Sequence, residues 1–156
     1  MKNIYFPDED ITENDLYFVC YMIERTARKL HQHNCYVVDK LGLNGLCHQL
    51  SVANVNHSAN PLQVEQDWID EYGLSSGDFD ITDVDKSLAE EIPSPTQIGK
   101  VYMRLILETL SPNENYAEAI LRVYNNGICK TIDNYNCSAF YEPSYVIARA
   151  YQDGGF

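Results

Sequence analysis

The sequence lacks the short motifs that mark the common enzyme classes. It contains no GxSxG nucleophile elbow, no GxxxxGK[ST] phosphate loop and no GxGxxG dinucleotide fingerprint. Five cysteines are present, and no two of them form a CxxC pair. Isolated thiols of this kind are usually small buried residues in a reducing compartment. No local motif therefore encodes a cofactor site or a catalytic residue, and we expect neither.

Long apolar runs are also missing. No stretch approaches the ~18 apolar residues that a membrane-spanning helix needs. The N-terminus, MKNIYFPDEDITEN, lacks the uninterrupted apolar region of a secretory signal. We therefore expect a cytoplasmic protein that does not bind a membrane.

Positive charge is scarce and unevenly placed. The chain has 11 Lys and Arg against 23 Asp and Glu, a net charge of −12. Residues 61–93 hold ten acids and Lys86 alone, which gives −9, while 1–60 carry −2 and 94–156 carry −1. Phosphate binding depends on clustered Lys and Arg, so nucleic acid is a poor partner for this chain. A basic protein surface is the natural complement of the acidic segment 61–93.

What the sequence does contain is the composition of one folded domain. Its 156 residues are 45% hydrophobic and include 12 tyrosines, whereas disordered chains are poor in aromatic residues. We expect a single domain over residues 1–156. Trp68, in the predicted helix 61–72, should anchor that helix in the core, although a place at an interface is the other interpretation.

Helix-start signals are abundant. Thr12 and Asp15 form a near capping box, and a stripe at helical spacing follows to Leu30. Asn60, Ser94 and Ser111 each precede a proline, with Gln or Glu two positions after it, which is a strong signature of a helix N-terminus. The predicted helices after the first are 35–41, 45–54, 61–72, 95–110, 112–125 and 143–152. No segment alternates with period two, so we predict an all-α bundle of about seven or eight helices.

The acidic stretch DFDITDVDKSLAEE begins like a calcium loop, with Asp78, Asp80 and Thr82 at alternate positions. Such a loop needs glycine at its sixth position and glutamate at its twelfth, where this chain has Asp83 and Ala89. An EF-hand is therefore excluded. The alternative is a helix that starts after Thr82, with Asp83 and Asp85 in its first turn. In that helix Val84, Leu88 and Ile92 would face the core.

Two other constellations are weaker. His31, His33 and Cys35 suggest zinc, but the histidines are two residues apart and no second ligand pair lies nearby in sequence, so we predict no metal site. A cysteine, a histidine and a carboxylate could still meet across helices and form a small enzyme site, since catalytic partners need only be close in space. Residues 128–142 fit no clean period, and their role stays open.

One resemblance bears on function. The segments YFVCYMIERTA (17–27) and NHSANPLQVEQDWI (56–69) resemble a family of small uncharacterised bacterial helical domains. In that family an Ile-Glu-x-x-Ala helix is followed by a His-Ser or His-Thr turn and a closing helix. Its genes often neighbour an ADP-ribosyltransferase-like toxin. The resemblance covers about residues 17–72, carries over no functional residue, and implies an antitoxin or accessory role.

These observations favour a bacterial, non-catalytic protein-binding domain over an enzyme. We expect an antitoxin or immunity-like role in which the acidic surface meets a basic partner. An acidic mimic of nucleic acid and the small Cys/His/carboxylate enzyme remain alternatives. The residues predicted to bind the partner are Asp70, Glu71, Asp78, Asp80, Asp83, Asp85, Glu90 and Glu91.

Overall fold

The computed structural model describes residues 1–156, and its regular secondary structure is helical, with one isolated bridge between Lys2 and Asp10 as the sole β pairing. Seven α-helices and one short 3₁₀-helix follow one another along the chain. They are α1 (Glu13–Leu30), α2 (Asn34–Asn56), α3 (Pro61–Tyr72), α4 (Pro95–Thr109), α5 (Tyr116–Tyr124), α6 (Cys129–Ile132), η1 (Ala139–Tyr141) and α7 (Ser144–Asp153). The predicted all-α bundle is therefore confirmed.

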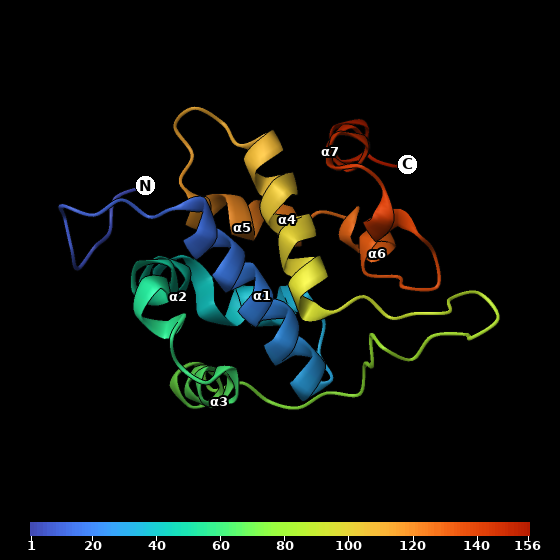
Figure 1. Cartoon of the computed structure of the whole chain (residues 1–156), viewed down its shortest axis with the longest axis horizontal. Helices are drawn as coiled ribbons and strands as arrows, with labels where there is room; N and C mark the ends of the chain where they lie inside the picture. Colours follow the sequence, from blue (N-terminus) through green and yellow to red (C-terminus); the bar gives the residue numbers. More distant parts are fainter.

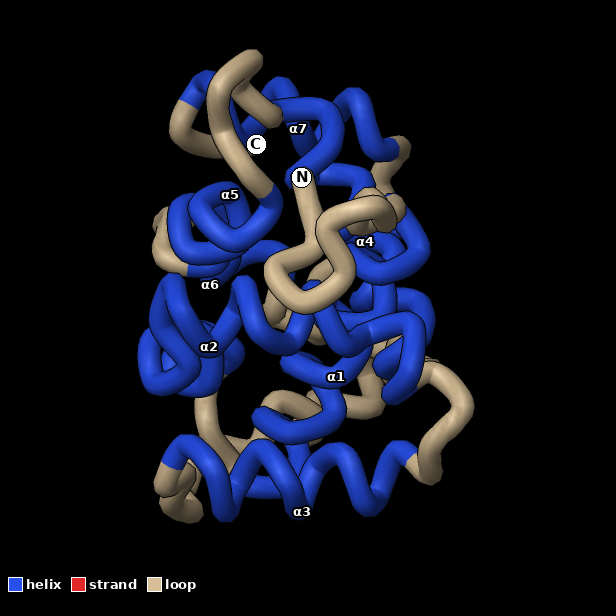
Figure 2. Tube along the Cα trace, turned by 90° about the vertical axis from the view of Figure 1, so that its left-hand side faces the viewer, coloured by secondary structure: helices blue, strands red, loops and turns tan.

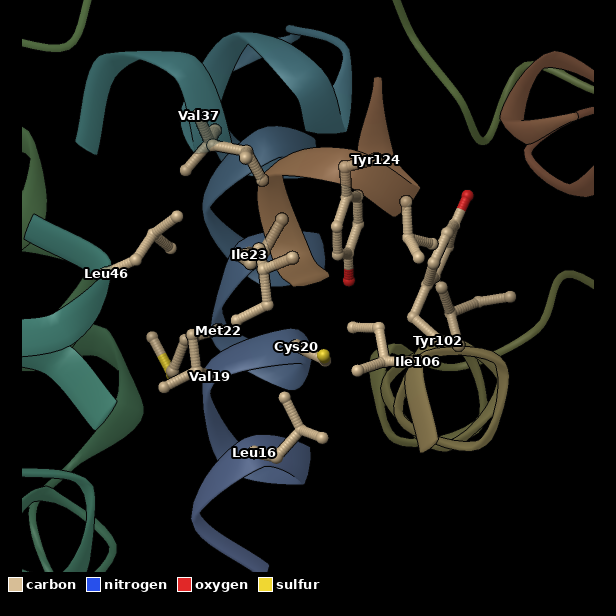
Figure 3. Close-up of a cluster of buried hydrophobic side chains, with 14 of the residues drawn as sticks. Leu16, Val19, Cys20, Met22, Ile23, Val37, Leu46, Tyr102, Ile106 and Tyr124 are labelled. Carbon is tan, nitrogen blue, oxygen red and sulfur yellow. The ribbon is translucent and has the colours of Figure 1, made fainter. Parts of the chain in front are cut away.

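Helix α1 is the centre of the bundle. It packs against α2 and α3 on one side and against α4 on the other, while α5 packs on α2 and α7 on α4 (Figure 1). Viewed at right angles, α3 closes one end of the molecule and α7 lies at the other end (Figure 2). Leu16, Val19, Cys20 and Ile23 from the predicted stripe are all buried, in the cluster that Figure 3 shows. Met22, off the stripe, is buried too, because α1 is covered on several sides.

Most helix starts lie where the sequence predicts them. The Thr12 hydroxyl accepts from the Asp15 amide, and the Asp15 carboxylate accepts from the Thr12 amide. Ser94 and Gln97 form the same reciprocal pair at α4, and Asn60 caps α3. One start is wrong: α5 begins at Tyr116 rather than 112. The reason is that Asn115 forms a complete capping box with Glu118, so Asn115 is the N-cap and the helix begins after it.

Gly42 separates the two predicted short helices as expected. Its φ of 66° and ψ of −178° interrupt α2, so that the two halves run in different directions. Trp68 is 1% exposed, which confirms its place in the core. In the segment without a clear period, Ile128, Ile132 and Tyr135 are nevertheless buried, around the short α6.

The predicted helix after Thr82 is wrong. Residues 73–94 form an extended loop that projects from the bundle between α3 and α4 (Figure 1). Thr82 caps nothing: both its amide and its hydroxyl donate to the Asp80 carboxylate, at 2.9 and 2.6 Å. Asp85 likewise accepts from the amide and hydroxyl of Ser87. These local turns use backbone amides that a helix would need, and no helix forms in this segment.

The apolar residues of that loop consequently differ from expectation. Leu88 is 67% exposed and Ile92 is 42% exposed, so neither faces the core. Val84 is only partly buried. Instead, Leu74 and Ile81 hold the loop to the bundle.

Gly99 allows α1 and α4 to approach closely. A Cβ at this position would stand 3.0 Å from the backbone nitrogen and the Cα of Tyr21. These are main-chain atoms of the central helix, and they can yield only if a whole helix shifts.

Gly99→Ala should therefore destabilise the protein. We expect the free energy of unfolding, measured by denaturant titration, to fall by about 1–3 kcal/mol, although alanine favours a helix over glycine by about 1 kcal/mol. Gly127→Ala is the matched control, because a Cβ there meets nothing within 4 Å. Equal unfolding midpoints for the two variants would show that the close crossing is not required.

Candidate functional site

A pocket of about 650 Å³ lies beside a group of buried polar side chains. Three segments enclose it: the start of α2, the first part of the 73–94 loop, and the chain from the end of α5 to residue 136. Its polar lining residues are His33, Asn34, Cys35, Asp80, Asp83, Asn125, Asn126, Lys130, Asp133, Asn134 and Asn136. Phe79, Ile81, Val84 and Tyr135 supply apolar wall. The acidic segment thus forms one side of the pocket.

A buried carboxylate lies directly behind this pocket. Glu24 of α1 is 1% exposed, yet each of its oxygens has donors. Arg28, one turn along α1, donates through Nε at 2.6 Å, and the Tyr135 hydroxyl donates at 2.8 Å. The Asn34 amide nitrogen donates at 2.9 Å. Burying a charge is tolerated when it is paired and fully hydrogen-bonded in this way.

A second carboxyl, Asp133, lies at the pocket. It accepts from the Tyr102 hydroxyl at 2.6 Å and from the Asn34 amide nitrogen at 3.4 Å. Burial, followed by the charge of Glu24, raises the pKa of Asp133 to about 8, and the hydrogen bonds only partly offset this. At neutral pH the Asp133 carboxyl is therefore largely protonated, while the Glu24 carboxylate is paired with Arg28.

Asn34 connects the two carboxyl groups and is itself incompletely bonded. Its amide nitrogen serves both Glu24 and Asp133. Its side-chain oxygen is buried and has no hydrogen-bond partner. An unpaired buried acceptor costs about 1–3 kcal/mol, so this oxygen is a place where a donor would be favourable.

The pocket does bring cysteines, a histidine and a carboxyl together, but they do not form a nucleophilic pair. His33 stacks on Phe79, with ring centroids 3.7 Å apart, and no hydrogen bond joins it to a thiol. The Cys129 thiol donates to the Val123 carbonyl at 3.0 Å. Burial raises the pKa of Cys129 to about 12 and also raises that of Cys35. Both thiols are protonated at neutral pH and are weak nucleophiles.

A groove of about 850 Å³ lies on another face, beside α3. The α3 side chains Asp67, Asp70 and Glu71 line it. Its other wall is apolar and exposed: Tyr5, Phe6 and Val55 are 49%, 48% and 63% exposed. The α3 residue Glu65 points inward instead, where Arg25 and Lys29 of α1 hold it at 2.6 and 3.6 Å.

The structure thus divides the eight predicted partner-binding residues among three places. Asp70 and Glu71 line the α3 groove, and Asp80 and Asp83 line the pocket. Asp78, Asp85, Glu90 and Glu91 lie exposed on the projecting loop. Local hydrogen bonds to Thr82 and Ser87 lower the pKa of Asp80 and Asp85, which keeps both carboxylates charged.

Sequence reasoning missed the residues of this hydrogen-bond network, namely Glu24, Asn34, Tyr102, Asp133 and Tyr135. Glu24 follows directly after the stripe residue Ile23 and resembles an ordinary surface acid. Asp133 and Tyr135 lie in the segment without a period. The sequence gives one weak indication of this network: Glu24 and Arg28 are spaced i, i+4, which predicts an ion pair between them on a helix.

Comparison with known proteins finds no matching family model, no similar curated protein and no similar solved structure. None of the helices combines the length and apolar character that crossing a membrane requires. No three His, Cys, Asp or Glu side chains are grouped so that they could hold a metal ion.

The raised pKa of Asp133 predicts how stability depends on pH. The native protein retains a proton up to about pH 8 that the unfolded chain, with an ordinary pKa of 3.8, has already released. Raising the pH through this window therefore favours the unfolded state. Asp133→Asn keeps an acceptor for Tyr102 and has no proton to lose. Relative to the natural protein, its free energy of unfolding should rise by at least about 1 kcal/mol between pH 5 and pH 8.

Denaturant titrations at several pH values measure this difference. Asp153→Asn, at the exposed end of α7, is the control and should follow the natural protein at every pH. If the free energy of unfolding of Asp133→Asn changes with pH just as that of the natural protein does, the Asp133 carboxyl does not have a raised pKa in the folded state.

Proposed function

We propose that this chain is a non-catalytic protein-binding domain that captures a basic partner through the acidic segment 61–93, in the manner of an antitoxin or immunity protein. The observation that carries the proposal is that the chain leaves this charge unneutralised. Of the ten acids in the segment, Glu65 alone takes part in an ion pair. The other ion pairs of the molecule, Arg28–Glu24 and Arg122–Glu114, involve no residue of the segment.

Apolar side chains stand exposed next to these carboxylates. On the loop, Leu88 and Ile92 flank Glu90 and Glu91 and are 67% and 42% exposed. Interfaces of high affinity usually combine charged rims with a few apolar or aromatic anchors that carry most of the binding energy. The loop supplies both the charged and the apolar side chains within five residues, 88–92.

The α3 groove repeats this combination. The Tyr5, Phe6 and Val55 side chains face solvent across from the carboxylates of Asp70 and Glu71. A partner segment with basic and apolar side chains complements such a groove in both charge and polarity. The two acidic areas therefore offer two contact regions for one basic partner or for two different segments of it.

Electrostatic steering explains what the unpaired charge does. Exposed like charges repel one another and stabilise nothing, so their benefit comes when a basic surface approaches. They raise the association rate and make it fall with ionic strength, while the apolar anchors slow dissociation. The Asx turns at Asp80 and Asp85 hold the carboxylates in place on a segment that has no helix.

The geometry favours this role over the alternative of a small Cys/His/carboxylate enzyme. The thiols in the pocket have raised pKa values, and no histidine is bonded to them. An activated nucleophile would need a lowered pKa or an adjacent base.

The test is a variant that removes loop charge without changing loop structure. In the quadruple variant Asp78→Asn, Asp80→Asn, Asp83→Asn and Asp85→Asn, the amide oxygens still accept from Thr82 and Ser87. We expect capture of the partner from a lysate to be lost. Binding of the purified partner should weaken at least tenfold at low salt, mainly through a slower association rate.

The control is a variant with the same change in net charge elsewhere. Asp8, Glu13, Glu142 and Asp153 are exposed, form no ion pair and lie outside the segment. Their joint conversion to Asn or Gln should leave capture intact. If both variants capture the same partner equally well, or both lose it equally, the acidic segment is not the binding surface.

A further inference from the structure

The pocket between α2, the 73–94 loop and α6 has the features of a ligand site in its own right. We propose that it binds an organic cation with N–H groups, a guanidinium or a primary ammonium, seated over Asn34 and Asp133 and held at the mouth by Asp80 and Asp83. A volume of about 650 Å³ suits a small ligand. A free amine and the tip of a basic side chain from another protein share this chemistry. The proposal does not depend on the binding of a partner by the exposed part of the loop.

The first support is the unfilled acceptor of Asn34. This residue lines the pocket and is 3% exposed, and its side-chain oxygen has no partner. Turning the amide around would not help, because the nitrogen is held by the Glu24 carboxylate at 2.9 Å. The oxygen would then face that negative charge. A donor from outside the protein is what completes this group.

The second support is the charge of the lining. Asp80, Asp83 and Asp133 contribute carboxyl groups, and Lys130 is the one Lys or Arg among the lining residues. Thr82 occupies one oxygen of Asp80, while the other oxygen makes no hydrogen bond within the protein. An anion would meet these groups unfavourably, whereas a cation with several N–H groups can be shared between them.

The third support is a pair of aromatic rings in the pocket lining. His33 and Phe79 stack with ring planes 15° apart and centroids separated by 3.7 Å, and both line the pocket. Guanidinium groups pack well against aromatic faces while donating from their edges. The two rings and the carboxylates of Asp80 and Asp83 thus offer a planar cation an aromatic surface and acceptors for its N–H groups, and the Asn34 oxygen is the nearby acceptor that lacks a donor.

Binding a cation should also release the proton of Asp133. The groups that face this carboxyl are Glu24 and Arg28 of α1, Cys35 of α2, Tyr102 of α4, Tyr124 of α5, and Cys129 and Tyr135. The thiols and phenols among them have raised pKa values and stay uncharged below pH 9. Glu24 and Arg28 form a buried ion pair. Asp133, with a pKa of about 8, is thus the group beside the ligand whose charge changes, so affinity should rise from pH 7 to pH 8.5.

The experiment is a calorimetric titration of the full chain with agmatine, which carries a guanidinium and an ammonium. We expect binding that tightens several-fold between about pH 7 and about pH 8.5. Asp133→Asn should weaken it about tenfold at the higher pH and abolish the pH dependence, because one charge is lost. Both proteins contain His33, so a difference in the pH dependence of their agmatine affinity is due to Asp133.

Further variants keep the test independent of folding. Asp80→Asn with Asp83→Asn, both on the exposed loop, should weaken agmatine binding. Lys130→Gln should strengthen it, since the variant removes the opposing charge. Asp153→Asn, outside the pocket lining, should leave the affinity unchanged. Denaturant titrations confirm that each variant is folded.

Three results would overturn the proposal. One is no binding of agmatine by the natural protein up to about 10 mM. Another is an unchanged affinity in both Asp133→Asn and the Asp80/Asp83 double variant. The third is equal binding of tetramethylammonium, which has the charge but no N–H group for Asn34. If agmatine does bind, a blocked Gly-Arg-Gly peptide that displaces it identifies a protein side chain as a source of the cation. A peptide that fails to displace it identifies a free amine.

Discussion

The buried carboxylate of Glu24 is the interaction on which the rest of the structure depends. A charged group at 1% exposure in the central helix must be fully bonded, and its donors come from three separate parts of the chain. Arg28 of α1 also reaches the Pro93 carbonyl and so fixes the end of the loop that precedes α4. Asn34 fixes the start of α2, and Tyr135 fixes the segment after α6. Because an unpaired buried charge is far more costly than an ordinary lost contact, this one group specifies how those elements meet.

The same group shapes the chemistry of the pocket. Its charge, added to burial, keeps the neighbouring Asp133 carboxyl protonated at neutral pH, and it holds the Asn34 amide so that the oxygen is left without a donor. The pocket therefore has a polar floor that is incompletely satisfied and whose charge can change. The acidic loop closes one side of this pocket with Asp80 and Asp83, so the chain's largest charge excess and its buried polar network lie next to each other.

The acidic loop also shows where reasoning from sequence fails. Thr82, Asp83 and Asp85 have the composition of a helix start, and Ser111-Pro112 has an equally good one, yet neither begins a helix. In both places a neighbouring side chain forms a local hydrogen bond instead. In the loop, the carboxylates of Asp80 and Asp85 accept from the hydroxyls of Thr82 and Ser87. At α5, Asn115 is the N-cap. The caps at Thr12, Asn60 and Ser94 are predicted correctly, and each accepts from a backbone amide in the first turn of its own helix.

The sequence by itself determined the helical class, most helix boundaries and the concentration of negative charge in residues 61–93. Caps, proline positions and hydrophobic stripes act between residues three or four apart, and so they can be read along the chain. Only the tertiary structure decided which carboxyls are buried. The hydrogen bonds that define the pocket join Asn34 to Asp133 across 99 positions and Glu24 to Tyr135 across 111. No local pattern distinguishes Glu24 from the exposed acids, because burial depends on which distant segment packs against it.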